Sequence, residues 1–361
     1  MQRTARRIAI INQKGGVGKT TTSVNLAAAL ANKGRKVCVL DLDPQAHATT
    51  HLGIEPDVDL PSMYDILVKN RAILDVRRDV NENLSIVGSD IDLAAAEVEL
   101  AGIVGREVIL REALSQDPEE LDFVLMDCAP SLGVLTLNAL AAADEVFIPL
   151  QPHFLALHGL SKLLETTELV CKRINPRLRV TGVIVCMYES ATKLAQEVVR
   201  DLNTFFERCR GSNKPWANAQ VFTTKIRRNI KLAECPSFGQ SIFQYAPSSN
   251  GAADYLRLAK EVLGEPLTEP TPVPVVTTAI PAEPMPVPVD ASLPDVEVPV
   301  AMGPMDLPAF EAIPAVDVGP DAIEELAVVL PEPVLVATGE PTRPVDAELE
   351  ALLAREFPGA D

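Results

Sequence analysis

A segment near the start of the chain, residues 13–20 (QKGGVGKT), has the residue types of a phosphate-binding loop. Its three glycines lack Cβ atoms, so backbone N–H groups can close around a phosphate. Lys19 can reach the β- and γ-phosphates of a nucleotide, and the Thr20 hydroxyl can complete the coordination shell of Mg²⁺. The common loop begins with glycine, whereas this one has Gln13 followed directly by a second lysine, Lys14.

The flanking sequence predicts the strand and the helix that such a loop requires. Residues 8–11 are apolar and mostly β-branched, and residues 20–30 are rich in alanine. A helix that begins in the loop directs its first N–H groups and its partial positive charge at a bound anion. The alternative, a glycine turn without a ligand, leaves this combination unexplained. The residues expected at the nucleotide are Lys14, Gly15, Gly16, Val17, Gly18, Lys19, Thr20 and Thr21.

Two aspartates follow predicted buried strands. Asp43 ends the strand over residues 37–42, directly before a proline that forces a turn. Asp127 ends a second strand that starts at residue 123. Because parallel strands gather ligands at their carboxyl ends, we expect Asp43 beside the phosphates and Asp127 at the Mg²⁺, through a water molecule. Each aspartate alone is equally well explained as a solvated loop residue, so the interpretation depends on the ordered combination with the loop.

These motifs resemble those of the ParA/Soj family of chromosome- and plasmid-partitioning ATPases. The similar segments are residues 14–20 (KGGVGKT), 41–46 (DLDPQA), 127–133 (DCAPSLG) and 228–239 (RNIKLAECPSFG), within a region from about residue 8 to about residue 264. The resemblance implies a P-loop NTPase of the deviant Walker A class that uses ATP and Mg²⁺. It further implies a weak ATPase whose ATP-dependent homodimer binds nucleoid DNA nonspecifically and is released when a ParB-type partner stimulates hydrolysis.

The resemblance also implies roles for single residues. Lys14 reaches across the dimer interface to the phosphates bound by the other protomer, Gly15 lies at that interface, and Asp43 orients the attacking water. The expected catalytic residues are thus Lys14, Lys19 and Asp43. A lysine supplied across an interface acts as an arginine finger does in trans, which couples hydrolysis to assembly.

A cluster of basic residues is the expected DNA surface, and its members are Lys193, Arg227, Arg228 and Lys231. Together with Lys225, three of these residues place four positive charges within residues 225–231, which suits contact with DNA phosphates. Such binding is nonspecific and strongly salt-dependent. The alternative is a solvated charged surface, because no aromatic ladder accompanies the cluster. Two positions depart from the family pattern. Ala191 stands where relatives tend to carry a DNA-binding arginine, and Ala129 stands where proline is usual.

The remaining periodicity predicts an α/β fold with a doubly wound, mostly parallel sheet. We expect strands over residues 84–88, 145–150 and 179–187, and helices over residues 93–115, 157–174, 192–208 and 252–263. Composition separates an ATPase domain, residues 1–264, from residues 265–361, which hold 19 of the 30 prolines and a net charge of −17 out of −18. Because the domain itself is nearly neutral, the low isoelectric point does not exclude nucleic acid.

Residues 265–361 are predicted to form a disordered acidic linker, because their prolines interrupt helices and few aromatic residues are available for a core. Two amphipathic segments, residues 321–330 and 346–357, are candidate short helices. As a hypothesis, these segments dock into a partner's groove, and the acidic linker competes with DNA for the basic residues. The alternative is an inert solvating tail.

The six cysteines form no C-x-x-C pair and lie mostly in apolar stretches, as reduced core thiols do. His47 and His51 are four residues apart, but they follow Asp43 where a mobile loop is expected, so a metal site there is disfavoured. His153 and His158 are interpreted as structural. The polar, basic start of the chain and the short apolar run after it predict neither a signal peptide nor a membrane span, and so a cytoplasmic, nucleoid-associated protein.

Several related functions fit less well. A MinD-like membrane-associated ATPase shares the loop but requires a basic amphipathic C-terminal helix, whereas this C-terminal region is acidic. Iron–sulfur relatives need paired cysteines, and a tyrosine kinase of this class needs a tyrosine-rich tail, whereas the last tyrosine is Tyr255. Two alternatives stay open: a ParA-like ATPase that positions a protein cargo on the nucleoid, and a scaffold that does not hydrolyse ATP.

Overall fold

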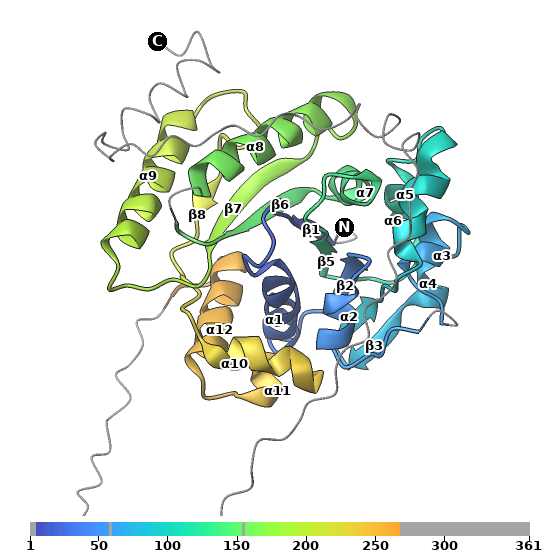
Figure 1. Cartoon of the computed structure of the whole chain (residues 1–361), viewed down its shortest axis with the longest axis horizontal. Helices are drawn as coiled ribbons and strands as arrows, with labels where there is room; N and C mark the ends of the chain where they lie inside the picture. The colour runs from blue at the N-terminus through green and yellow to red at the C-terminus, as the bar shows by residue number, and fades with distance from the viewer. Residues whose placement is uncertain (1–4, 58–59, 154–155, 268–361) are drawn as a thin grey trace, which may run out of the picture. The chain divides into compact units, whose positions relative to one another are not determined.

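The computed structural model of the 361-residue chain describes residues 5–57, 60–153 and 156–267. Both candidate short helices, residues 321–330 and 346–357, and nearly all of the predicted acidic linker lie outside the described residues. In the described part, a twisted sheet runs through the centre and helices cover both of its faces (Figure 1).

The strands of the described residues form one eight-stranded sheet in the order β3-β4-β2-β5-β1-β6-β7-β8. Neighbouring strands are parallel, except for the antiparallel pair β3 and β4. The prediction of a doubly wound, mostly parallel sheet is therefore confirmed. The strands are β1 (Arg6–Ile10), β2 (Val37–Leu42), β3 (Arg78–Asn81), β4 (Leu84–Val87), β5 (Phe123–Cys128), β6 (Glu145–Leu150), β7 (Arg179–Val185) and β8 (Gln220–Val221).

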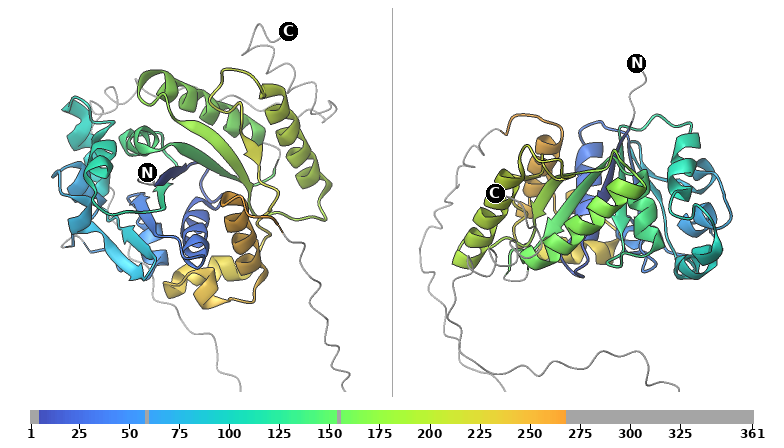
Figure 2. Two further views of the ribbon diagram at one scale, coloured as in Figure 1. Left: turned by 180° about the vertical axis from the view of Figure 1, so that it is seen from behind. Right: turned by 90° about the horizontal axis from the view of Figure 1, so that it is seen from above.

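The helices form two layers, one on each face of the sheet (Figure 2). They are α1 (Lys19–Ala31), α2 (His47–His51), α3 (Met63–Leu67), α4 (Ile73–Val76), α5 (Leu93–Glu99), α6 (Ile109–Gln116), α7 (Val134–Ala142), α8 (Ala156–Arg173), α9 (Lys193–Cys209), α10 (Ile230–Glu234), α11 (Ile242–Tyr245) and α12 (Asn250–Val262), with the 3₁₀ turns η1 (Leu100–Gly102) and η2 (Cys235–Phe238).

Alternate side chains of the central strands pack in two separate hydrophobic cores, one on each face of the sheet. In β1, Ile8 and Ile10 pack in the core that includes α1, α11 and α12, whereas Ala9 packs in the core that includes α3 and α5 to α9. Strands β2 and β5 are buried along their whole length. Burial on both faces is the environment in which parallel strands are continuous apolar runs, as these two are.

Two predicted boundaries are wrong. The single helix expected over residues 93–115 is divided into α5, η1 and α6 by residues 103–108, where Ile103 is extended (φ −91°, ψ 126°) and Gly105 takes a left-handed φ of +79°. The strand expected over residues 179–187 ends at Val185, and Met187 has a left-handed φ of +51° that ends the extended backbone.

The segment after Asp43 forms the short helix α2, where the sequence predicts a mobile loop. The buried His51 places its Nε2 3.3 Å from Sγ of Cys235 in η2, and burial lowers the pKa of His51 to about 4. His47 is exposed, so the two imidazoles do not face a common site. Among the described residues, no group of three or more His, Cys, Asp or Glu side chains is placed to hold a metal ion.

Directly after helix α2, the backbone at Gly53 lies very close to the backbone at Gly239. Gly53 has a φ of +79°, and a Cβ atom added to it would lie 2.8 Å from the carbonyl oxygen of Gly239, which ends η2. A Cβ on Gly239 would lie 2.7 Å from Cα of Gly53. The two segments can therefore approach this closely only because both residues are glycine.

Gly53→Ala should lower the free energy of unfolding by roughly 2–4 kcal/mol, because the new methyl group meets a backbone oxygen and the backbone is left-handed. Gly34→Ala is the matched control, since its φ is +72° but a Cβ there would meet nothing within 4 Å. It should cost only about 1 kcal/mol. Urea unfolding measures both, and equal losses would contradict the tight packing of α2 on η2.

Candidate nucleotide site

The predicted phosphate loop lies between β1 and α1, as the sequence indicates. Gly16 and Gly18 have φ values of +71° and +93°, so the loop uses backbone conformations that side chains disfavour. Gly18 is the N-cap of α1, and its carbonyl accepts a hydrogen bond from the N–H of Thr22 at 2.9 Å. The first N–H groups of a 13-residue helix are thus directed into the loop, which is the arrangement that binds phosphate.

Lys19 is folded back over this loop. Its ammonium donates to the carbonyl oxygen of Lys14 at 3.4 Å, and the residue is 7% exposed. Burial lowers the pKa of Lys19, while the nearby charges of Asp127 and Asp43 oppose that shift. A cation held in this way lies where the β- and γ-phosphates of a nucleotide would enter the loop.

Asp127 lies in β5 beside the loop and is 1% exposed. Its Oδ1 accepts a hydrogen bond from the Ser23 hydroxyl at 2.7 Å, whereas its Oδ2 is buried without a hydrogen-bond partner. Burial raises the pKa of Asp127, and the nearby side chains of Ser23 and Thr20 oppose the shift. An unsatisfied carboxylate oxygen next to the Thr20 hydroxyl fits a hydrated Mg²⁺, which prefers oxygen ligands and retains several waters.

Asp41 is a site residue to which sequence reasoning assigned no role. It lies opposite Asp127 in the β2–β5 pairing and is fully buried. Its Oδ2 accepts from the Thr49 backbone N–H at 2.9 Å and from the Thr49 hydroxyl at 2.7 Å, and its Oδ1 accepts from the N–H of Asp43 at 3.2 Å. Burial and the neighbouring Asp127 raise its pKa. Asp41 therefore fixes both α2 and the turn at Asp43; the D-x-D spacing at the end of a strand was the signal for it.

Asp43 is half-buried and follows β2 at the carboxyl edge of the sheet. Its Oδ1 accepts a hydrogen bond from the N–H of Gln45 at 3.0 Å, so the carboxylate is held by its own turn. Its charge acts on both Lys19 and Asp127, which places it in the same cluster. Ala129, which stands where relatives usually carry proline, is buried directly after β5.

Lys14 contacts a residue outside the loop in which it lies. Its ammonium Nζ is 2.5 Å from Nε2 of His153, which lies between β6 and α8. From the sequence, His153 is interpreted as structural, and no feature of the sequence links it to Lys14. The ammonium of Lys14 thus lies at His153, whereas the ammonium of Lys19 lies over the phosphate loop.

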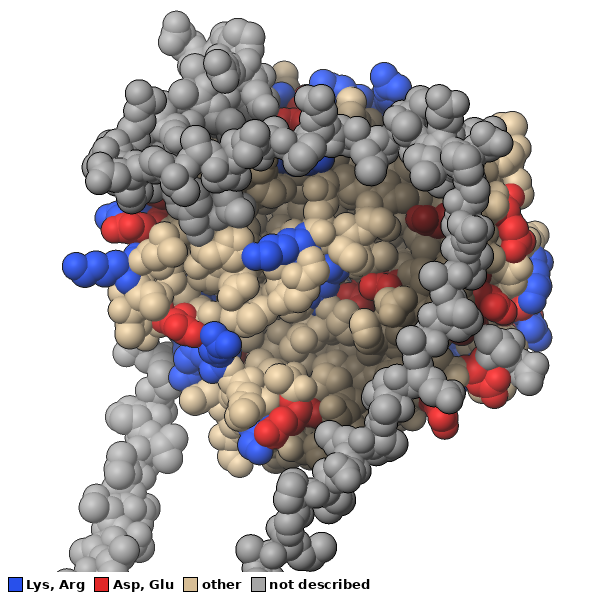
Figure 3. Space-filling model, in the orientation of Figure 1, with Lys and Arg blue, Asp and Glu red and all other residues tan. Residues whose placement is uncertain are grey.

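Three of the four predicted DNA-binding residues make ion pairs within the chain. Arg227 makes a bidentate ion pair with the buried Asp254 at 2.7 and 2.9 Å, and Arg228 binds Glu189 at 3.1 Å. Lys231 binds Glu234 at 2.8 Å. Lys193 begins α9. On the face seen in Figure 3, basic side chains stand singly or beside acidic ones, without forming one continuous positive area.

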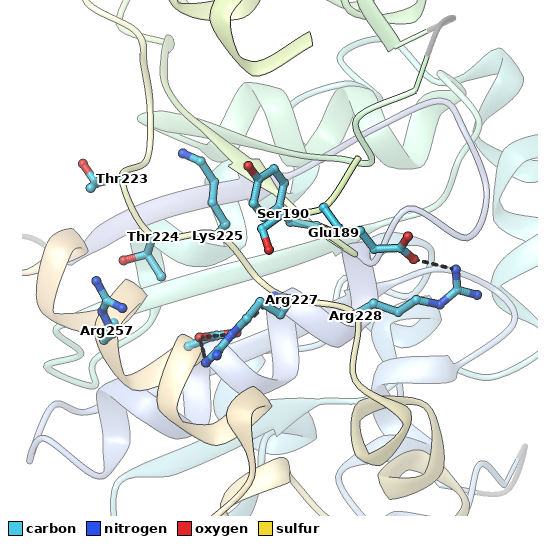
Figure 4. A pocket seen from close by; sticks show the side chains of 11 residues that line it. Glu189, Ser190, Thr223, Thr224, Lys225, Arg227, Arg228 and Arg257 are labelled. Carbon is cyan, nitrogen blue, oxygen red and sulfur yellow. Dashed lines mark hydrogen bonds and ion pairs between the residues drawn. The ribbon is translucent and has the colours of Figure 1, made fainter. Parts of the chain in front are cut away.

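A pocket of about 600 Å³ contains part of this basic surface. It is lined by Arg227 and Arg228 together with Lys225 and Arg257, whereas Lys193 and Lys231 are not among its lining residues. Figure 4 shows Arg227 and Arg228 among the lining side chains, with the ion pair of Arg228 and Glu189 drawn as a dashed line. Ala191, the second departure from the family pattern, also lines the pocket, so a larger side chain there would project toward it.

The chain is similar to several known proteins. A family model described as an AAA domain matches residues 5–180. The sporulation initiation inhibitor protein Soj of Bacillus subtilis is 45% identical over 256 residues, which covers 71% of this chain and 97% of that protein. The chromosome-partitioning ATPase Soj of Thermus thermophilus is 46% identical over 258 residues, which covers 72% of this chain and 95% of that protein.

A solved structure of cobyrinic acid a,c-diamide synthase from Mycobacterium smegmatis, with bound ADP and magnesium, has a TM-score of 0.61 to this chain. It is 34% identical and covers 72% of this chain and 94% of its own. The loop between β1 and α1 and the aspartate in β5 define a P-loop nucleotide-binding protein, and this likeness agrees with that class. Given the identity to the two Soj proteins, the chain belongs to the ParA/Soj family of partitioning ATPases. Within its described residues, no helix is long and apolar enough to cross a membrane.

Asp127→Asn should make the ligand-free protein more stable at pH 8 by on the order of 1–3 kcal/mol. Because the pKa of Asp127 is raised in the folded state, the folded protein is most stable when this carboxyl is protonated, and it loses free energy of unfolding as the pH rises through that pKa. The neutral amide of Asn removes this loss. At pH 4 the two proteins should unfold at similar temperatures. Thermal unfolding without Mg²⁺ measures this, and a variant that is less stable at both pH values would contradict the argument.

Proposed function

We propose that the protein is a weak, Mg²⁺-dependent ATPase whose ATP-bound form is a homodimer that holds nonspecific DNA during chromosome or plasmid partitioning. The supporting observation is that the side chains of the two loop lysines make different contacts. Lys19 covers the phosphate cradle of its own protomer, whereas Lys14 is exposed and contacts His153 on another loop. A second cation in that position is available for a nucleotide bound by another protomer.

In this proposal the nucleotide lies along Lys14 to Thr21, with its phosphates on the backbone N–H groups of the glycines. Thr20 and Asp127 hold the Mg²⁺, whose charge neutralises the phosphate oxygens. Asp43 orients the attacking water, and Lys19 with the Lys14 of the second protomer stabilises the charge of the transferring phosphoryl group. Because one of these cations arrives only on dimerisation, hydrolysis by a single protomer is slow.

The DNA surface in this proposal comprises Lys193, Arg227, Arg228 and Lys231. Arg228 and Lys231 are paired only with exposed or half-exposed carboxylates, and such pairs are worth about 0–1 kcal/mol, so phosphates can displace their partners. Arg227 makes an ion pair with the carboxylate of Asp254, whose side chain is 3% exposed, so Arg227 neutralises a buried charge as well as being a candidate for contact with DNA. A ParB-type partner that stimulates hydrolysis then releases the protein from the nucleoid.

Lys14→Ala should abolish the ATP-dependent dimer while leaving ATP affinity within about threefold, because Lys19 and the glycine backbone still hold the nucleotide. Analytical ultracentrifugation with a non-hydrolysable ATP analogue and Mg²⁺ measures the dimer, and titration calorimetry measures the affinity. Lys36→Ala, which removes an exposed lysine at the start of β2, is the control. A Lys14→Ala protein that still dimerises and turns over normally would show that the lysine does not act across an interface.

Arg228→Ala should weaken DNA retention and reduce the salt dependence of binding by about one unit of slope, with little change in melting temperature. Arg227→Ala should weaken DNA binding and also destabilise the fold, since Asp254 is left buried without its cation. Arg208→Ala on the exposed last turn of α9 is the matched control. Fluorescence anisotropy with duplex DNA at several salt concentrations measures binding. If Arg228→Ala binds like the control, Arg228 makes no phosphate contact.

A further inference from the structure

The contact between Lys14 and His153 joins two loops that are 139 residues apart. The Nζ to Nε2 distance is 2.5 Å. A lysine ammonium has hydrogens to donate and no acceptor, so the imidazole must accept through the lone pair of Nε2. The contact therefore requires a neutral His153 that carries its proton on Nδ1.

Neighbouring hydrogen bonds hold the two loops in this arrangement. The side chain of Asn12 donates to the carbonyl oxygen of Pro149 at 2.8 Å and accepts from the backbone N–H of Lys14 at 3.0 Å. The carbonyl of Leu150 accepts from the N–H of Cys186 at 2.9 Å, which fixes the end of β6 against β7. Asn12 thus ties the start of the phosphate loop to the strand that leads to His153, so their approach is built into the fold.

We propose that His153 is a positioning residue for Lys14. His153 keeps the lysine side chain on its own protomer until a second nucleotide-loaded protomer offers a phosphate. This inference rests on the proposed ATP-dependent dimer. In the free protomer the ammonium has a neutral acceptor, and in the dimer it exchanges that acceptor for a phosphate anion. The exchange sets the dimerisation affinity, because the contact with His153 must be lost when the new one forms.

The same geometry makes the retention sensitive to pH. Lys14 is a charged group that acts on His153, and the ammonium of Lys19 lies 3.4 Å from the Lys14 carbonyl oxygen. Burial and the charge of Lys14 lower the pKa of His153, so the imidazole is neutral at neutral pH. When acid protonates it, two cations face each other and the lysine is released. Dimerisation should therefore become easier as the pH falls through the pKa of His153.

Three variants test the role of His153 in the full-length chain with a non-hydrolysable ATP analogue and Mg²⁺. His153→Ala should lower the dimer dissociation constant at pH 7.5 about tenfold, the effect of losing one charge-assisted hydrogen bond. His153→Gln offers Lys14 a carbonyl oxygen that does not titrate, so it should retain the native dissociation constant at pH 7.5 and lose the pH dependence. His158→Ala, which changes an exposed histidine of α8, is the control and should behave as the native protein does.

A second readout is the titration of His153 itself, followed by NMR. In Lys14→Ala its pKa should rise toward the ordinary histidine value, because the neighbouring positive charge is gone. If the native protein dimerises but His153→Ala and His153→Gln both match it at every pH, His153 does not position Lys14 and the proposed dimer is unaffected. If the native protein stays monomeric with the analogue at all concentrations, the proposed function fails and the retention of Lys14 fails with it.

Discussion

The structure depends on a cluster of buried charges at the carboxyl edge of the parallel sheet. Lys19 approaches Asp127 and Asp43, and Asp127 lies opposite Asp41 on the neighbouring strand. Burial disfavours the charged form of Lys19, Asp41 and Asp127, and one oxygen of Asp127 has no hydrogen-bond partner. Burying these charged groups lowers the stability of the fold, but it leaves their charges already placed for a phosphate and a cation. The sheet order makes this possible, because β1 lies directly between β5 and β6.

The same order connects the charge cluster to the basic surface. The Thr49 hydroxyl of α2 donates to Asp41 at 2.7 Å and accepts from the N–H of Ser89 at 2.9 Å, so α2 is attached to the sheet edge. At its other end α2 contacts η2 through His51, and η2 follows α10 directly. A displacement of the turn at Asp43 is therefore expected to move α10, which carries Lys231. The packing gives the nucleotide site a continuous physical connection to the segment that we propose to contact DNA.

Local chemistry accounts for the parts of the site that were predictable from sequence. The phosphate loop and the strand-end aspartates could be placed because each depends on neighbours within a few residues and on the apolar runs around them. The core strands could be placed for the same reason. Long-range pairing could not be predicted: the contact of Lys14 with His153 and the ion pair of Arg227 with Asp254 join residues far apart in sequence. The helix expected over residues 93–115 is divided at an extended Ile103 and a left-handed Gly105. The sequence does not reveal this break, because glycines within helical patterns do not all break helices.

Coupling of hydrolysis to dimerisation requires that Lys14 acts on the nucleotide of a second protomer. A crystal structure of the protein with a non-hydrolysable ATP analogue and Mg²⁺ tests this most directly, through the distance from Lys14 Nζ to the nearest phosphate oxygen. We expect a face-to-face dimer in which that oxygen belongs to the nucleotide held by the other protomer, at about 3 Å. A nucleotide-loaded protein in which Lys14 contacts the phosphates of its own protomer, or remains on His153, would contradict the account.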